Sequence, residues 1–205
     1  MLANAVTLSR LIFLAFCVYL LHLPAFGARL TAFVLIIFTI FIDAIDGMIA
    51  RRRGSVSALG AVLDIAIDRV VENVFWITFV TLNLVPLWVA LVVVTRGILT
   101  DAVRGFAMGL GLKPFDMMKT SWGRWLVSQR FMRGLYGVTK AVTFPVLALV
   151  HALVPVWQGT PEAVYLPALR VAADVLVAIT IAMNLLRGIP VLIESRRFFF
   201  ADRQA

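Results

Sequence analysis

Six apolar stretches, each close to the length that crosses a lipid bilayer, dominate this sequence. About 20 consecutive apolar residues span the hydrocarbon core as an α-helix, which satisfies its own backbone hydrogen bonds there. The 205-residue chain is 62% hydrophobic and only 15% charged. We therefore predict an all-α, polytopic membrane protein, with six transmembrane helices in one bundle and a single domain over residues 1–205. The predicted helices cover about Leu8–Phe26, Leu30–Ala50, Ala58–Phe79, Pro86–Leu112, Phe131–Val154 and Leu166–Ile193.

The formal charge of +8 is distributed unevenly among the predicted loops. If the six helices alternate from an N-terminus inside the cell, most lysines and arginines fall on one side, which the positive-inside rule assigns to the cytoplasm. The predicted location is the inner (plasma) membrane, with the basic side facing the cytoplasm. No basic patch lies on a soluble module, so we expect the lipid bilayer and no nucleic acid as the partner of these cations.

Four aspartates lie at the junction of the second and third apolar stretches. Asp43 and Asp46 are three residues apart, and Asp64 and Asp68 are four apart, so each pair lies on one helical face. A short basic turn predicts an antiparallel hairpin in which the four carboxylates converge. Ionised groups at membrane depth cost about 2.5–3.5 kcal/mol each, so this cluster needs a compensating charge. Oxygen ligands without His or Cys favour Mg²⁺, Mn²⁺ or Ca²⁺, and Mg²⁺ points to a phosphoanhydride substrate.

The residues around the aspartates follow the pattern D-x2-D-G-x2-A-R-x8-G-x3-D-x3-D. This pattern resembles, at every fixed position, the signature of the CDP-alcohol phosphotransferase (CDP-alcohol phosphatidyltransferase) family. Asn4, Thr7 and Arg10 resemble the family's N-terminal N-x2-T-x2-R segment. The resemblance implies a transferase of phospholipid biosynthesis that moves a phosphatidyl group from CDP-diacylglycerol to an alcohol and releases CMP. It also implies a homodimer.

The resemblance implies roles for individual residues as well. Asp43, Asp46, Asp64 and Asp68 would bind Mg²⁺ or Mn²⁺, and Asp68 would also be the catalytic base toward the acceptor hydroxyl. The residues that would bind the CDP moiety are Asn4, Thr7, Asp43, Asp46, Gly47, Ala50, Arg51, Gly60 and Asp64.

The second half of the chain carries more positive charge than a neutral acceptor needs, which favours a phosphorylated alcohol. Segments ending in Arg104 and Arg124 look like segments of bacterial phosphatidylglycerophosphate synthases, so the resemblance implies glycerol 3-phosphate as the acceptor. Arg104, Lys119 and Arg124 would bind its phosphate. Gly97 stands where those enzymes usually have Glu, and L-D-I-A-I-D-R replaces their L-D-P-x-A-D-K. Inositol phosphate or another polyol therefore remains an open alternative.

Several of these polar residues also have structural interpretations. Arg104 is three residues from Asp101, and Glu72 is three residues from Arg69, so each pair can form an ion pair on one helical face. The aspartates can pair with the arginines of the basic turn. The functional alternative is a divalent-cation transporter, which would place acids along a path across the bilayer. The clustering of the aspartates at one end favours the enzyme.

Overall fold

The structure of the chain is a computed structural model that describes residues 2–53, 58–111 and 120–201. Within these ranges, it describes all side chains except those of residues 2–8, 43–53, 58–61, 64, 128, 130 and 197–201. The described chain is entirely helical apart from its connections. Its elements are α1 (Leu2–His22), α2 (Phe26–Arg53), α3 (Ala58–Thr81), α4 (Leu87–Gly109), α5 (Ser121–Ser128), α6 (Arg130–Trp157), the 3-10 helix η1 (Pro161–Tyr165) and α7 (Leu166–Ala201).

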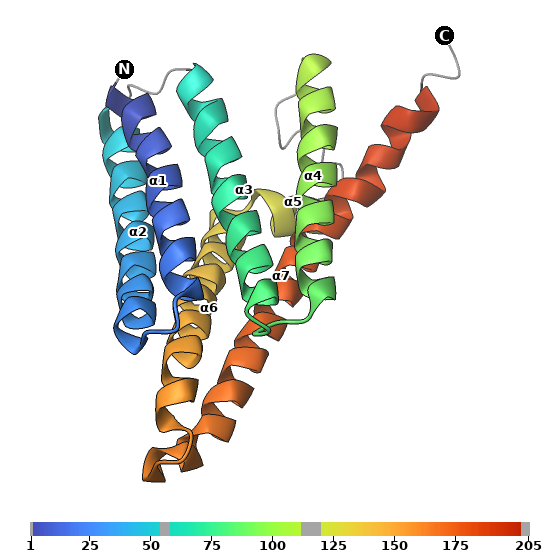
Figure 1. Cartoon of the computed structure of the whole chain (residues 1–205). Coiled ribbons are helices and arrows are strands. Elements are labelled where there is room, and N and C mark those ends of the chain that lie inside the picture. Colours follow the sequence, from blue (N-terminus) through green and yellow to red (C-terminus); the bar gives the residue numbers. More distant parts are fainter. Residues whose placement is uncertain (1, 54–57, 112–119, 202–205) are drawn as a thin grey trace.

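The long helices form one bundle in which α1 packs against α2 and α3, α2 against α6, and α7 against both α4 and α6 (Figure 1). The start of α1, the end of α2 and the start of α3 lie together at one end, which we call the hairpin end. The connections α1–α2, α3–α4 and α6–α7 lie at the other end, which we call the far end. The two helix segments that carry the four aspartates of the sequence analysis therefore lie at the hairpin end.

Each of the six predicted apolar stretches corresponds to a long helix of the structure. Two differences have physical reasons. Helix α7 continues eight residues beyond the predicted end at Ile193, because hydropathy follows the apolar part of a helix and backbone hydrogen bonding continues beyond it. Helix α5 has only eight residues, so it is too short to appear in the sequence as a membrane-spanning apolar stretch. Its first turn is capped by the Thr120 hydroxyl, which accepts a hydrogen bond from the Gly123 amide at 3.3 Å.

Aromatic side chains of α3 and α6 form the centre of the packed core. The rings of Trp76 and Phe144 meet edge to face with centroids 5.3 Å apart. Phe75 and Phe79 lie 5.3 and 5.8 Å from Phe144, and all four side chains are buried. Along α3 these aromatic residues follow the charged ones, so apolar packing is concentrated toward the far end and polar groups toward the hairpin end.

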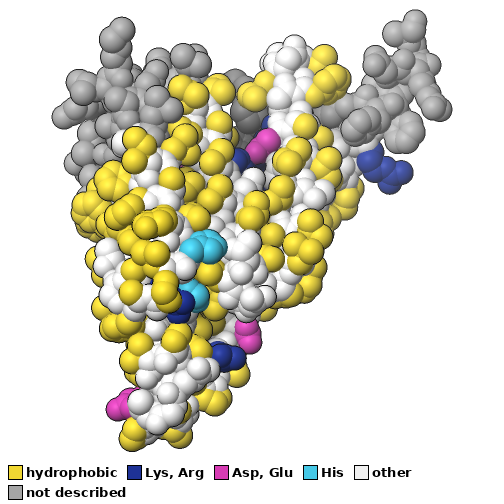
Figure 2. Space-filling view, in the orientation of Figure 1, with side chains coloured by type: hydrophobic (Ala, Val, Ile, Leu, Met, Phe, Trp, Pro, Cys, Tyr) yellow, Lys and Arg dark blue, Asp and Glu magenta, His cyan; other side chains and the backbone are white. Residues whose placement is uncertain are grey.

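Two helical segments of the described chain are long and apolar enough to cross a membrane, Phe131–Trp157 and Pro161–Arg196. Ser9–His22 and Phe26–Ile42 are shorter apolar helices. Large hydrophobic side chains such as Ile12 cover the outside of the bundle, and Figure 2 shows a largely apolar face. Extended apolar surfaces of this kind are rare on soluble monomers and suit contact with lipid. The number of six spans stays a prediction.

Candidate active site

Three helices bring the predicted metal and CDP residues to the hairpin end. The start of α1 carries Asn4 and Thr7, and the final part of α2 carries the residues from Asp43 to Arg51, while the first part of α3 carries Gly60, Asp64 and Asp68. Because α1 packs against both α2 and α3, these segments are neighbours (Figure 1). The side chains that lie outside the described set are Asn4, Thr7, Asp43, Asp46, Gly47, Ala50, Arg51, Gly60 and Asp64. Convergence of the four carboxylates therefore stays a prediction.

Asp68 is the one predicted catalytic side chain that the structure describes. Its side chain is 58% exposed, and its Oδ1 lies 3.7 Å from Nη1 of Arg10, which is itself largely buried. Arg10 belongs to the N-terminal segment that resembles the family pattern. The contact joins α1 to α3. An exposed carboxylate in this position is suited to accept a proton from a bound alcohol.

Glu72 lies one helical turn after Asp68 and is the centre of a buried polar network. It is only 2% exposed. One carboxylate oxygen, Oε2, accepts from Lys140 Nζ and from Arg69 Nη1, both at 3.0 Å. The other, Oε1, accepts a short hydrogen bond from the Tyr136 hydroxyl, which in turn accepts from Asn184 Nδ2 at 2.7 Å. The network joins α3, α6 and α7, and the predicted pairing of Glu72 with Arg69 is confirmed.

A second carboxylate, Asp101 on α4, continues this network toward the hairpin end. Its Oδ2 accepts from Arg69 Nε at 2.8 Å, and its Oδ1 lies 3.5 Å from Arg104 Nη1. The structural interpretation of Arg104 as a partner of Asp101 is thus correct. Figure 2 shows acidic and basic side chains in the space between α3 and α4, with hydrophobic side chains on both sides of them. Arg69 follows Asp68 in sequence, so the network adjoins the proposed base.

Arg96, Arg104 and Arg187 form a group of cations that we call the arginine cluster. Each has a buried Nε that forms no hydrogen bond with the described residues. Arg96 is only 6% exposed, and the positive charges of Arg96 and Arg104 repel that of Arg187. Among the described side chains, no carboxylate forms an ion pair with Arg96 or Arg187. Buried charges are costly unless they are paired. The cluster is therefore suited to bind an anion.

The charge balance of the combined network supports the same conclusion. Five cations, Arg69, Arg96, Arg104, Lys140 and Arg187, surround two carboxylates, Glu72 and Asp101. Three positive charges remain within this described set. Arginine presents a planar fork of donors that matches phosphate oxygens. A phosphate monoester, which carries nearly two negative charges at neutral pH, fits the unpaired part of this site.

The predicted acceptor residues have three different outcomes. Arg104 is part of the arginine cluster. Lys119 lies outside the described residues, and Arg124 is exposed on α5, which packs against α6 and α7. A role of any of the three in acceptor binding stays a prediction. Arg187 was missed by sequence reasoning, although a lone cation within the apolar run N-L-L-R-G-I-P is a signal of a functional site at membrane depth.

The close approach of Gly188 to Arg96 leads to a prediction. A Cβ at Gly188 would lie 2.6 Å from Arg96 Cγ and even closer to Nε, so Gly188→Ala must displace this arginine. Overpacking of this kind costs about 1–3 kcal/mol, and we expect the KM for the phosphorylated acceptor to rise at least about fivefold. Steady-state kinetics with varied acceptor measure it. Gly105→Ala is the matched control, because its Cβ would meet nothing within 4 Å. An unchanged KM in Gly188→Ala would show that Arg96 does not bind the acceptor.

Tyr136 provides a test of the buried network itself. In Tyr136→Phe the ring remains, but Glu72 loses one donor and the Asn184 amide loses its acceptor. A buried polar group left unsatisfied costs about 1–3 kcal/mol, so we expect a clear fall in the unfolding temperature of the purified protein. Tyr19→Phe is the control, because Tyr19 is 61% exposed. Equal unfolding temperatures of the two variants would show that the network contributes nothing to stability.

The described side chains contain no group of three or more His, Cys, Asp or Glu residues that is placed to hold a metal. Three of the four predicted ligands lie outside that set, so the prediction of Mg²⁺ or Mn²⁺ rests on the donor chemistry. If the four carboxylates converge as predicted, they would form an all-oxygen set, which suits a hard divalent cation. Asp68, the described member of the set, is exposed and at the hairpin end, which is compatible with this role.

Comparison with known proteins gives two kinds of relationship. The family model described as CDP-alcohol phosphatidyltransferase matches residues 1–185. The chain is 30% identical over 93 residues to an archaetidylinositol phosphate synthase of Aeropyrum pernix, a match that covers 44% of this chain and 47% of that protein. It is 26% identical over 145 residues to an archaetidylinositol phosphate synthase of Methanothermobacter thermautotrophicus, with 65% and 73% covered. The chain thus spans about half the length of the first relative.

Proposed function

The chain belongs to the CDP-alcohol phosphatidyltransferase family, and from this premise we propose that it transfers the phosphatidyl group of CDP-diacylglycerol to an inositol phosphate, releasing CMP. Its apolar helices and its family make it a membrane protein. The observation that carries the acceptor class is the arginine cluster, which offers unpaired donors to a phosphate monoester. A free alcohol would leave Arg96 and Arg187 without an anionic partner among the described side chains.

The choice among phosphorylated acceptors is supported by the relatives. Both named relatives are archaetidylinositol phosphate synthases, whereas the segments ending in Arg104 and Arg124 resemble those of glycerol 3-phosphate enzymes. The comparisons favour the inositol phosphate alternative over glycerol 3-phosphate. Both molecules carry the phosphate that the arginine cluster suits, so only the remainder of the acceptor distinguishes them.

In the proposed reaction, the arginine cluster and the aspartates have separate roles. The arginine cluster holds the acceptor phosphate, which fixes the attacking hydroxyl near Asp68. Asp68 takes the proton of that hydroxyl as its oxygen bonds to the lipid-bearing phosphorus. The bond from this phosphorus to the bridging oxygen breaks, and CMP leaves with that oxygen. A divalent metal bound by Asp43, Asp46 and Asp64 would supply neutralisation of the pyrophosphate charge.

We expect the site to face the cytoplasm, because the basic loops and the hairpin fall on the same side of the predicted topology. A homodimer is also part of the proposal, on the basis of the family resemblance alone. The cation-transporter alternative is less well supported, since the carboxylates of the buried network, Glu72 and Asp101, are paired with cations.

An acceptor panel tests the proposal. Purified protein is supplied with CDP-diacylglycerol, Mg²⁺ or Mn²⁺, and one of four acceptors: inositol phosphate, glycerol 3-phosphate, inositol or glycerol. We expect CMP release and lipid product with inositol phosphate, and rates at least about tenfold lower with the two unphosphorylated alcohols, since their phosphate contacts are lost. Equal rates with inositol and inositol phosphate would refute the role of the arginine cluster in acceptor binding. If no acceptor gave CMP release, the transporter hypothesis would be favoured instead.

A further inference from the structure

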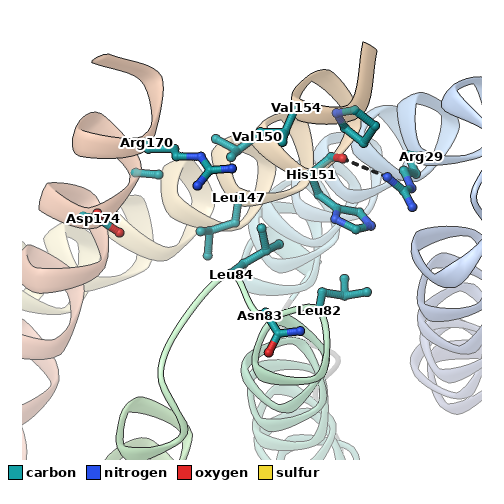
Figure 3. A pocket seen from close by; sticks show the side chains of 12 residues that line it. Arg29, Leu82, Asn83, Leu84, Leu147, Val150, His151, Val154, Arg170 and Asp174 are labelled. Atoms are coloured by element: carbon teal, nitrogen blue, oxygen red, sulfur yellow. Dashed lines mark hydrogen bonds between the residues drawn. The ribbon is translucent and has the colours of Figure 1, made fainter. Parts of the chain in front are cut away.

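A cavity of about 470 Å³ opens at the far end of the bundle, at the opposite end from the aspartate hairpin (Figure 3). Side chains from four parts of the chain line it, namely the start of α2, the α3–α4 connection, the last part of α6 and the first part of α7. The lining residues that matter for its chemistry are Arg29, Asn83, Leu147, His151, Arg170 and Asp174. Nothing in the proposed reaction uses this cavity.

The walls of the cavity are held in place by specific contacts. Asn83 has a positive φ of 57°, a conformation that Asn tolerates better than most residues, and it reverses the chain between α3 and α4. Arg29 donates from Nε to the Leu23 carbonyl at 2.9 Å and from Nη1 to the His151 carbonyl at 3.2 Å. The His151 ring donates to the Leu21 carbonyl at 2.9 Å. The site is therefore built before any ligand binds.

Three charged side chains line the cavity, and none of them is paired with another. Within the described part of the chain, the hydrogen bonds of Arg29 go to carbonyl oxygens. Arg170 and Asp174 are four residues apart on α7, yet neither forms an ion pair or hydrogen bond with any described residue. Figure 3 shows Arg29 and Arg170 on opposite sides of the cavity, with Leu147, Val150 and Leu84 between them. The lining thus combines two cations, one carboxylate and an apolar wall.

We propose that this cavity binds the headgroup of an anionic phospholipid that carries hydroxyl groups, such as a phosphatidylglycerol. The net charge of +1 complements the single negative charge of such a lipid, with the phosphate between Arg29 and Arg170 and a headgroup hydroxyl donating to Asp174. The volume lies within the roughly 300–1,000 Å³ of small-ligand sites. It suits a headgroup, whose acyl chains would lie along the apolar exterior of the bundle.

The aromatic residues next to the cavity support a lipid as the source of the phosphate. Trp157 and Tyr165, at the α6–α7 connection, meet with ring centroids 6.5 Å apart, and Trp88 at the start of α4 is exposed. Trp and Tyr are enriched where a membrane protein meets the membrane–water interface. Their position at the same end of the bundle as the cavity is what a site at the depth of lipid headgroups requires.

Lipid binding to the purified full-length chain tests this site. The protein in detergent is titrated with phosphatidylglycerol or phosphatidylcholine of the same acyl chains, and bound lipid is counted by native mass spectrometry. We expect Arg170→Gln to weaken phosphatidylglycerol binding about tenfold, since one charge-assisted contact is lost, and to leave phosphatidylcholine binding unchanged. Arg170 has no described partner, so the variant keeps the fold. Arg196→Gln, an exposed cation near the other end of α7, is the matched control.

Each outcome decides the proposal in one direction. Selective loss in Arg170→Gln, with cross-linking of a photoactivatable phosphatidylglycerol to the peptide that contains Asn83, supports it. Equal loss in Arg196→Gln overturns it, because the effect would then come from net charge alone. Displacement of the lipid by millimolar inorganic phosphate also overturns it, since the cavity would then be a site for free phosphate. The readout is binding, so it is independent of the proposed reaction.

Discussion

Replacing Asp68 by asparagine is expected to lower kcat by about 10²–10⁴-fold, the usual contribution of a general base. The amide has nearly the same shape as the carboxylate but cannot take the proton of the acceptor hydroxyl. Because Asp68 is 58% exposed and its described ionic contact, to Arg10, is 3.7 Å long, we expect the fold to be retained. CMP release under saturating acceptor measures kcat, and equilibrium binding of CDP-diacylglycerol, expected within about threefold of the parent protein, shows that the nucleotide site is intact.

The control for this experiment is Glu162→Gln, which removes an exposed carboxylate in η1 at the far end. Its kcat should equal that of the parent protein. A near-normal kcat for Asp68→Asn would remove Asp68 from the role of base. Parallel loss of kcat and of CDP-diacylglycerol binding would instead make it chiefly a metal or nucleotide ligand.

Arg187→Gln is expected to lower kcat/KM for the phosphorylated acceptor by about 10²-fold, because truncating a desolvated charge at a binding site typically costs about 2–5 kcal/mol. The same substitution should raise the unfolding temperature or leave it unchanged. Arg187 is repelled by Arg96 and Arg104. Its guanidinium lies 5.3 Å from the centre of the Tyr136 ring, but no described carboxylate pairs with it. Removing its charge relieves the repulsion. A variant that is at least as stable and much less active separates a binding role from a structural one.

Two comparisons make the Arg187 experiment decisive. The residual rate with unphosphorylated inositol should be the same in Arg187→Gln and the parent protein, since that acceptor has no phosphate to lose. Arg196→Gln removes a cation from the same helix, exposed rather than buried, and should leave both rates unchanged. If Arg187→Gln lowers the two rates equally, the residue does not contact the acceptor phosphate.

Hydropathy predicted the long helices because each is an autonomous apolar run, and i, i+3 spacing predicted the ion pairs Arg69–Glu72 and Arg104–Asp101. These features depend on residues close in sequence. Two hydrogen bonds of the network were not predicted: the one from Tyr136 on α6 to Glu72, 64 residues away, and the one from Asn184 on α7 to Tyr136, 48 residues away. Such contacts depend on how the helices pack, which periodicity does not specify.

In the candidate site, too, features formed by residues close in sequence were predicted, and contacts that depend on helix packing were not. The aspartate signature was readable because its positions are fixed within one hairpin. The arginine cluster was only partly predicted, since Arg96 and Arg104 on α4 meet Arg187 only through the packing of α4 against α7. The far-end cavity was not predicted at all, because its lining residues are drawn from four separate segments.

The hydrogen bonds around Tyr136 have a direction, and this fixes how three helices sit along one another. Asn184 donates to the phenolic oxygen, which then has its own proton to give only to Glu72. Apolar side chains in a bilayer gain little from choosing one helix neighbour over the next, because lipid tails are as apolar as they are. A shift of α6 by one residue would break both bonds. These two consecutive hydrogen bonds thus set the longitudinal register of α3, α6 and α7, which hydrophobic contacts alone leave loosely defined.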